Sequence, residues 1–163
     1  MFDSAKIKES ARKRTKENQK VFNQLKRKTN SEADHLFHDA HDEVFEEVDC
    51  LKCANCCKTT SPIFYERDVE RMAKAFKMRP SDFITKYLII DEDKDYVFKG
   101  APCPFLDDEN FCIAYDSRPT ACREYPHTNR KNIKQIFKLT EKNLEICPAV
   151  GLMMQKIELS INH

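Results

Sequence analysis

Residues 50–57 read Cys50-Leu-Lys-Cys53-Ala-Asn-Cys56-Cys57, and this run of four cysteines decides how we expect the chain to fold. A Cys-x2-Cys spacing lets two thiolates turn back on one metal ion, while the backbone N–H groups between them donate to sulfur. Three such thiols in succession match the spacing with which ferredoxin-type chains hold three corners of an iron–sulfur cubane. We therefore expect a core organised around a thiolate metal centre.

Four more cysteines follow this run: Cys103, Cys112, Cys122 and Cys147. Proline follows Cys103 and Cys147, a context in which ferredoxin-type chains place a further ligand. Adjacent side chains usually diverge, so Cys56 and Cys57 can serve two different sites, or one can bind metal while the other packs. Eight thiols divide into two four-cysteine sites or into one site with four spare thiols. The spacing leaves both divisions open, and all eight cysteines are candidate ligands.

Disulfides and a redox dithiol are the alternatives to metal binding. The start of the chain lacks the apolar segment of a secretory signal, and no apolar run approaches the roughly 20 residues of a membrane span. We therefore expect a cytoplasmic protein with no membrane partner, in a compartment where thiols stay reduced. Cys56 and Cys57 would also make an awkward disulfide, and no thioredoxin-like context surrounds the Cys-x2-Cys pairs. These observations favour a metal site.

The composition indicates a thin apolar core covered by charged helices. Of 163 residues, 34% are charged, against a globular average of about 25%, and there are only two glycines. Small cores of this kind are often supplemented by metal or disulfide crosslinks. With so few glycines, glycine-rich nucleotide loops are excluded. No catalytic triad or paired-carboxylate site is visible, so the sequence leaves open whether the protein is an enzyme.

Charge is arranged in two neighbouring blocks of opposite sign. Residues 1–30 carry ten Lys and Arg against three Asp and Glu, whereas residues 31–50 carry eight Asp and Glu and no Lys or Arg. The basic block could contact nucleic acid, but its Lys and Arg are not interleaved with aromatic residues, and charge runs are usually just solvated. Antiparallel pairing of two oppositely charged helices explains the blocks equally well.

The N-terminal part of the chain predicts a helical hairpin. Residues 3–28 have helical composition, with an apolar stripe interrupted by Arg14 and Asn18, so we expect the first half to project into solvent. Ser31 is expected to cap a second helix over residues 32–48. The predicted domains are this hairpin, residues 1–48, and a cysteine-cluster metal-binding domain, residues 49–163.

The cluster domain should be mainly irregular, with short elements. Helices are expected over residues 66–77, after a cap at Ser81, over residues 130–141 (where a strand also fits), and from Pro148 onward. Residues 87–90 and 96–99 predict a minor hairpin, and residues 101–126 a cysteine- and proline-rich loop. The predicted fold class is mainly α, with an irregular cysteine-rich metal-binding core: a helical hairpin plus a small α(+β) cluster domain.

Ordered motifs downstream of the cysteine run carry a family resemblance. They are Ala101-Pro-Cys-Pro-Phe-Leu106, Phe111-Cys-Ile-Ala-Tyr115, Arg118-Pro-Thr-Ala-Cys-Arg123, Glu124-Tyr-Pro126 and Cys147-Pro-Ala149. Over about residues 48–158 the chain resembles the CxxCxxCC cysteine-cluster family (YkgJ-like), a zinc- or iron-chelating domain by name. The resemblance implies metal or iron–sulfur binding through these cysteines and a link to iron–sulfur oxidoreductases. Part of the wider family resembles flagellin lysine methylases, but those chains have an extra domain for which this one lacks room.

Other side chains near the cysteines are weaker candidates. Arg118 and Arg123 are predicted to bind the cofactor, because a centre with four thiolates has a formal charge near −2 that guanidinium groups would stabilise; binding of an anionic substrate is the alternative. His35, His38 and His41 share a helix, where a solvated face is the favoured interpretation over a metal site. His127 follows Cys122 closely but is expected to be a surface loop residue.

We expect the metal centre to be an iron–sulfur cluster or zinc. The favoured function is an iron–sulfur centre with a redox or electron-transfer role and an unidentified redox or protein partner, as part of an oxidoreductase. The alternative is a non-enzymatic zinc module whose closed thiolate sites fold an interaction surface, because all-cysteine ligation suits structural zinc nearly as well.

Overall fold

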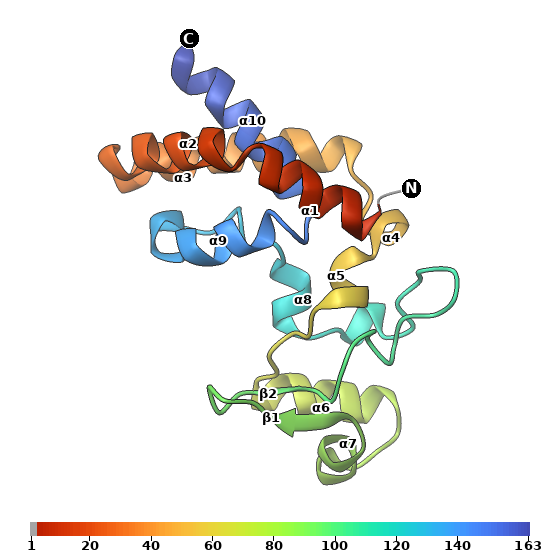
Figure 1. The fold of residues 1–163 in the computed structure, drawn as a ribbon. Helices are drawn as coiled ribbons and strands as arrows, with labels where there is room; N and C mark the ends of the chain where they lie inside the picture. Colours follow the sequence, from red (N-terminus) through yellow and green to blue (C-terminus); the bar gives the residue numbers. More distant parts are fainter. Residues whose placement is uncertain (1–2) are drawn as a thin grey trace. The chain divides into compact units, whose positions relative to one another are not determined.

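The computed structural model describes residues 3–163 (Figure 1). As predicted, the fold is mainly α, and the sheet in the described residues is a small two-stranded one. The chain divides into two compact units. We call Met1–Asn55 with Pro126–His163 the helical unit, and Cys56–Tyr125 the inserted unit. The domain boundary after residue 48 stays a prediction.

The helical unit begins with two helices where one was predicted. α1 spans Ser4–Lys13 and α2 spans Thr15–Arg27. The helix is interrupted at Arg14 (φ −102°, ψ 15°), and the Thr15 hydroxyl donates to the Arg12 carbonyl at 2.9 Å, which competes with regular helical bonding. The expectation that the first half projects into solvent is wrong. Ile7 is only 7% exposed, because α1 packs against the last helix of the chain.

The acidic helix α3 spans Asn30–Glu47, close to its predicted range. Its cap is Thr29, so the prediction that Ser31 caps it is wrong. The Glu32 amide donates to the Thr29 hydroxyl oxygen at 3.2 Å, and the Thr29 amide donates to the Glu32 carboxylate at 2.8 Å. This reciprocal capping box satisfies two N–H groups that a cap at Ser31 would leave unpaired.

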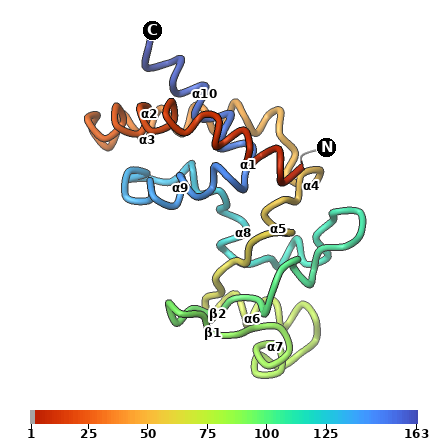
Figure 2. The backbone as a smooth tube through the Cα atoms, viewed as in Figure 1, coloured from red at the N-terminus to blue at the C-terminus, as the bar shows by residue number. Residues whose placement is uncertain are grey.

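The C-terminal segment completes the helical unit. The 3₁₀ helix η2 (Ile133–Ile136), α9 (Phe137–Asn143) and α10 (Pro148–Asn162) follow the inserted unit. As predicted, Pro148 occupies the first turn of the last helix. Figure 2 shows the backbone path of α3 and α10, whose apolar faces meet in the core. The ring of Phe137 lies 5.1 Å from that of Phe22 and 6.0 Å from that of Phe37.

The inserted unit contains short helices and the predicted hairpin. α5 (Asn55–Thr59) begins just before it; α6 (Glu66–Ala75) and α7 (Pro80–Tyr87) precede the strands β1 (Leu88–Ile90) and β2 (Tyr96–Phe98). The strands pair antiparallel, with Leu88 opposite Phe98. Ser81 does not cap α7 as predicted, because Pro80 already takes the first helical position after Arg79. The stretch predicted as loop also holds two short turns of helix, η1 (Tyr115–Ser117) and α8 (Thr120–Glu124).

Phe105 joins the cysteine-rich loop to the core of the inserted unit. Its side chain is 3% exposed. Its ring centroid lies 4.8 Å from that of Phe76, 4.9 Å from Tyr87, 5.8 Å from Phe98 and 6.1 Å from Phe83. Because Phe105 follows Cys103 by two residues, packing of this ring fixes the position of the cysteine.

Candidate metal centre

Three cysteine thiols lie near one another in the helical unit. Cys50 and Cys53 are the first and last residues of the short helix α4, which the Asp49 carboxylate caps by accepting the Leu51 amide at 2.9 Å. Cys147 is the residue before α10. The pKa of Cys147 is raised to about 11, mainly by burial; the amides of the first turn of α10 act against this rise, and negative charge on Cys50 and Cys53 adds to it. Cys147 therefore lies within electrostatic reach of both other thiols.

Four other cysteines lie near one another in the inserted unit, and we call Cys57, Cys103, Cys112 and Cys122 the thiol tetrad. Burial raises the pKa of Cys122 to about 12, and negative charge on each of the other three thiols contributes to the rise. The pKa of Cys103 is raised to about 11, first by burial and then by Cys57 and Cys112. The Cys103 amide also donates to the Cys57 carbonyl at 2.8 Å, which ties two distant parts of the chain together.

A tight turn brings Cys103 and Cys112 together. The Leu106 amide donates to the Cys103 carbonyl at 3.1 Å, and the Ile113 amide to the Phe105 carbonyl at 2.9 Å. The Asp107 carboxylate closes the turn by accepting the Glu109 and Phe111 amides at 2.9 and 2.7 Å. Backbone amides just after each cysteine lower its pKa against the effect of burial. N–H groups directed at sulfur in this way stabilise thiolates and metal-bound sulfur.

The adjacent cysteines have different roles in the inserted unit. A hydrogen bond from Cys56 lowers the pKa of Cys57 to about 7, although burial acts in the opposite direction. Cys57 is therefore the tetrad member that ionises most readily, and the thiolate is the form that binds metal. The prediction that Cys50, Cys53 and Cys56 hold one centre together stays a prediction.

Arg118 lies in the turn between Cys112 and Cys122, and Arg123 directly follows Cys122 in α8. The Arg118 guanidinium lies 3.8 Å from the centre of the Tyr115 ring, and its charge lowers the pKa of both flanking cysteines. Arg123 instead donates to two backbone carbonyls, those of Asp116 at 2.8 Å and Arg118 at 3.2 Å. Arg118 therefore supplies positive charge to the tetrad, and Arg123 holds the backbone of the turn. Direct contact of either with a cofactor stays a prediction.

Of the three histidines on the acidic helix α3, His35 agrees with the predicted solvated face better than His38 and His41 do. His35 is exposed and lies 3.4 Å from the Asp39 carboxylate. His38 Nε2 lies 3.0 Å from the Arg130 carbonyl, and His41 Nδ1 lies 2.8 Å from the Thr128 hydroxyl, so both hold the following loop. His127, also in that loop, has a left-handed backbone (φ 66°).

The donor chemistry of the tetrad fits zinc or iron. Cys57, Cys103, Cys112 and Cys122 are thiols rather than half-cystines, which answers the disulfide alternative for this unit. Four soft sulfur donors select zinc or iron–sulfur centres over harder ions. Within residues 3–163, no three Cys, His, Asp or Glu side chains are arranged tightly enough to hold an ion as they stand. Binding would therefore have to draw the sulfurs of the tetrad inward.

Sequence reasoning missed a buried carboxylate that supports the tetrad. Asp68 in α6 is completely buried and accepts hydrogen bonds from Arg71, Thr120 and the Tyr65 amide. Burial by itself would raise the pKa of Asp68, but these hydrogen bonds outweigh it and lower the pKa. The sequence showed only that Asp68 is the third residue of a predicted helix. That position indicates an N-terminal cap and does not reveal the hydrogen bond with Thr120, 52 residues away.

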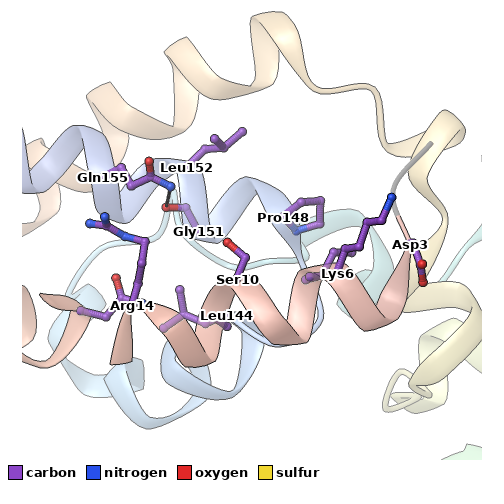
Figure 3. Close-up of a pocket in the computed structure, with 12 residues that line it drawn as sticks. Asp3, Lys6, Ser10, Arg14, Leu144, Pro148, Gly151, Leu152 and Gln155 are labelled. Atoms are coloured by element: carbon purple, nitrogen blue, oxygen red, sulfur yellow. Dashed lines mark hydrogen bonds between the residues drawn. The ribbon is translucent and has the colours of Figure 1, made fainter. Parts of the chain in front are cut away.

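A separate cleft lies in the helical unit between α1 and α10 (Figure 3). Its volume is about 240 Å³, and its walls include Ile7, Ser10, Leu144 and Gly151. Its twelve lining residues include no cysteine or histidine, so this cleft is not part of a thiolate site.

Comparisons with known proteins agree with the donor chemistry. The family model CxxCxxCC, described as "Putative zinc- or iron-chelating domain", matches residues 49–148, which is more than half of the chain. Searches of curated proteins and of solved structures found no match. None of the helices in the described residues has the length and apolar character needed to cross a bilayer.

Proposed function

Since this chain belongs to the CxxCxxCC family of zinc- or iron-chelating domains, we propose that its thiol tetrad holds an iron–sulfur centre with an electron-transfer role. The observation that carries this proposal is the convergence of Cys57, Cys103 and Cys112 on the partly buried Cys122 within one compact unit. A donor set made only of thiols is the one that iron–sulfur centres use most often.

The surroundings of the tetrad support a redox role. An iron–sulfur centre supplies reversible one-electron transfer, at a potential tuned by net charge, hydrogen bonds to sulfur and solvent exposure. Here Arg118 offsets negative charge, and backbone amides of the 103–115 turn face the sulfurs of Cys103 and Cys112. The tetrad thiols are only partly buried, which leaves a short path to the surface for an electron. The partner in this proposal is an unidentified redox or other protein.

Cys50, Cys53 and Cys147 form a second candidate set in the helical unit. We propose that they also bind metal, separately from the tetrad. Contact with nucleic acid through residues 1–30 stays a prediction.

A structural zinc module is the second candidate function, and one observation favours it. The turn that carries Cys103 is anchored in the apolar core through Phe105. Closed four-cysteine zinc sites stabilise folds in this way.

The test is to purify the protein without air or added metal and to measure iron, zinc and acid-labile sulfide. Iron with sulfide and visible charge-transfer absorption would support the electron-transfer centre, whereas colourless protein with stoichiometric zinc would replace it with the zinc module. The variants Cys122→Ser and Cys147→Ser control for each other. Cys122→Ser should lose the metal of the tetrad and Cys147→Ser should keep it; equal loss in both, or no loss in Cys122→Ser, would reject the tetrad.

A further inference from the structure

Asp68 connects α6 to the segment that leads into Cys122. One carboxylate oxygen, Oδ1, accepts from the Thr120 amide at 3.0 Å, the Thr120 hydroxyl at 2.9 Å and Arg71 Nη2 at 2.6 Å. The other oxygen accepts from the Tyr65 amide at 3.1 Å and so starts α6. Asp68 therefore does two things at once: it begins its own helix, and it holds the residue that opens the first turn of α8.

Arg71 fixes the same segment from one turn further along α6. Its Nε donates to the Ser117 carbonyl at 3.2 Å, and its Nη2 donates to the Arg118 carbonyl at 2.8 Å. A guanidinium presents its donors in a rigid fork, so these contacts define orientation as well as position. Together with the contacts of Asp68, they bind three places in residues 117–120 to a regular helix.

This segment lies between two members of the tetrad. The Tyr115 amide donates to the Cys112 carbonyl at one end, and the Cys122 amide donates to the Pro119 carbonyl at the other. Both cysteines are thus joined by short backbone turns to residues that α6 holds. Arg71 neutralises the buried carboxylate, so the support adds no net charge beside a centre that is already negative.

We propose that Asp68 and Arg71 are positioning residues that hold Cys122 in place for metal, although neither touches the metal. This inference rests on the proposed function of the tetrad. When its ligands are already held in place, a metal ion binds without the cost of ordering them. Loss of the Asp68 and Arg71 contacts should therefore weaken metal binding and change the ligand geometry.

The experiment compares the full-length wild type with Asp68→Asn and Thr120→Val. Zn²⁺ affinity is measured by competition with a chromophoric chelator, and the ligand-field spectrum of bound Co²⁺ reports the geometry of the thiolates. We expect both variants to bind Zn²⁺ about 10–100-fold more weakly, as is usual for residues that orient metal ligands, with an altered Co²⁺ spectrum. Thr120→Val keeps the shape of the side chain and removes the hydroxyl that donates to Asp68. It therefore tests the positioning role even if Asp68→Asn does not fold.

Asp82→Asn is the matched control. Asp82, in the first turn of α7, pairs at 3.0 Å with Arg79, the residue before that helix. The pair lies in the same unit and has the same three-residue spacing as Asp68 and Arg71, but it is exposed. It should leave affinity and spectrum unchanged. Wild-type affinity and spectrum in Thr120→Val, or equal losses in Asp82→Asn, would overturn the inference. A wild type that binds neither Zn²⁺ nor Co²⁺ would instead overturn the proposed function beneath it.

Discussion

Replacing Phe105 with alanine should destabilise the inserted unit by about 3–5 kcal/mol, the usual cost of removing a fully buried phenylalanine. Transfer of the ring to water accounts for about 1.5–3 kcal/mol of this cost. Four neighbouring rings within 6.1 Å lose their partner, and each favourable ring pair is worth about 0.5–1.5 kcal/mol. The variant Phe105→Leu should cost less than Phe105→Ala, because it keeps most of the buried volume and loses mainly the ring pairs.

The chain provides a matched control for this prediction in the same loop. Phe111 also neighbours a cysteine, but it is 49% exposed, so Phe111→Ala should change stability by no more than about 0.5 kcal/mol. Native-state hydrogen exchange at the amides of α6 and α7 measures the stability of the inserted unit directly. A loss of about 3 kcal/mol speeds that exchange on the order of 100-fold. If Phe105→Ala and Phe111→Ala accelerated exchange equally, the claim that Phe105 anchors the cysteine loop would be refuted.

Three further predictions concern the helical unit. Thr29→Ala should lower stability by about 1 kcal/mol in urea unfolding, because it removes the capping box with Glu32, while Ser31→Ala should be nearly neutral; the reverse order would contradict the cap. Gly151→Ala should raise the melting temperature through a gain of about 0.5–1 kcal/mol, since a Cβ there meets no atom within 4 Å; a decrease would show that the cleft closes around this residue. Burial lowers the pKa of His41 from 6.5, so its contribution to stability is present above pH 6.5 and is lost as pH falls below it. His41→Gln should flatten that part of the pH profile of urea unfolding, and an unchanged profile would argue against a partly buried, neutral imidazole.

Local signals in the sequence were sufficient for most elements. Pro148 marks the start of a helix, and two β-rich stretches flank an acidic turn. Both signals depend on residues close together in the sequence, and both elements were predicted correctly. The cap of α3 was also legible, because Glu32 lies three residues after Thr29. The choice of Ser31 failed because only one of the two hydroxyls fits the reciprocal pairing.

The division of the cysteines could not be predicted from spacing. Cys53 and Cys57 are four residues apart, yet they belong to different compact units, Cys53 with Cys147 and Cys57 with Cys103. That separation depends on contacts such as the amide of Cys103 with the carbonyl of Cys57, across 46 positions. The role of Asp68 was hidden for the same reason, since its partner Thr120 is distant in sequence.

The helical unit is built from both ends of the chain, and this has a consequence for biosynthesis. Met153 and Ile157, which complete its core, are made only after the whole inserted unit. When Tyr125 leaves the ribosome, every member of the tetrad is present while Cys147 is still missing. Compact units generally fold as they emerge during translation. We therefore expect the nascent protein to acquire its first metal at the tetrad, before the remaining helices can assemble.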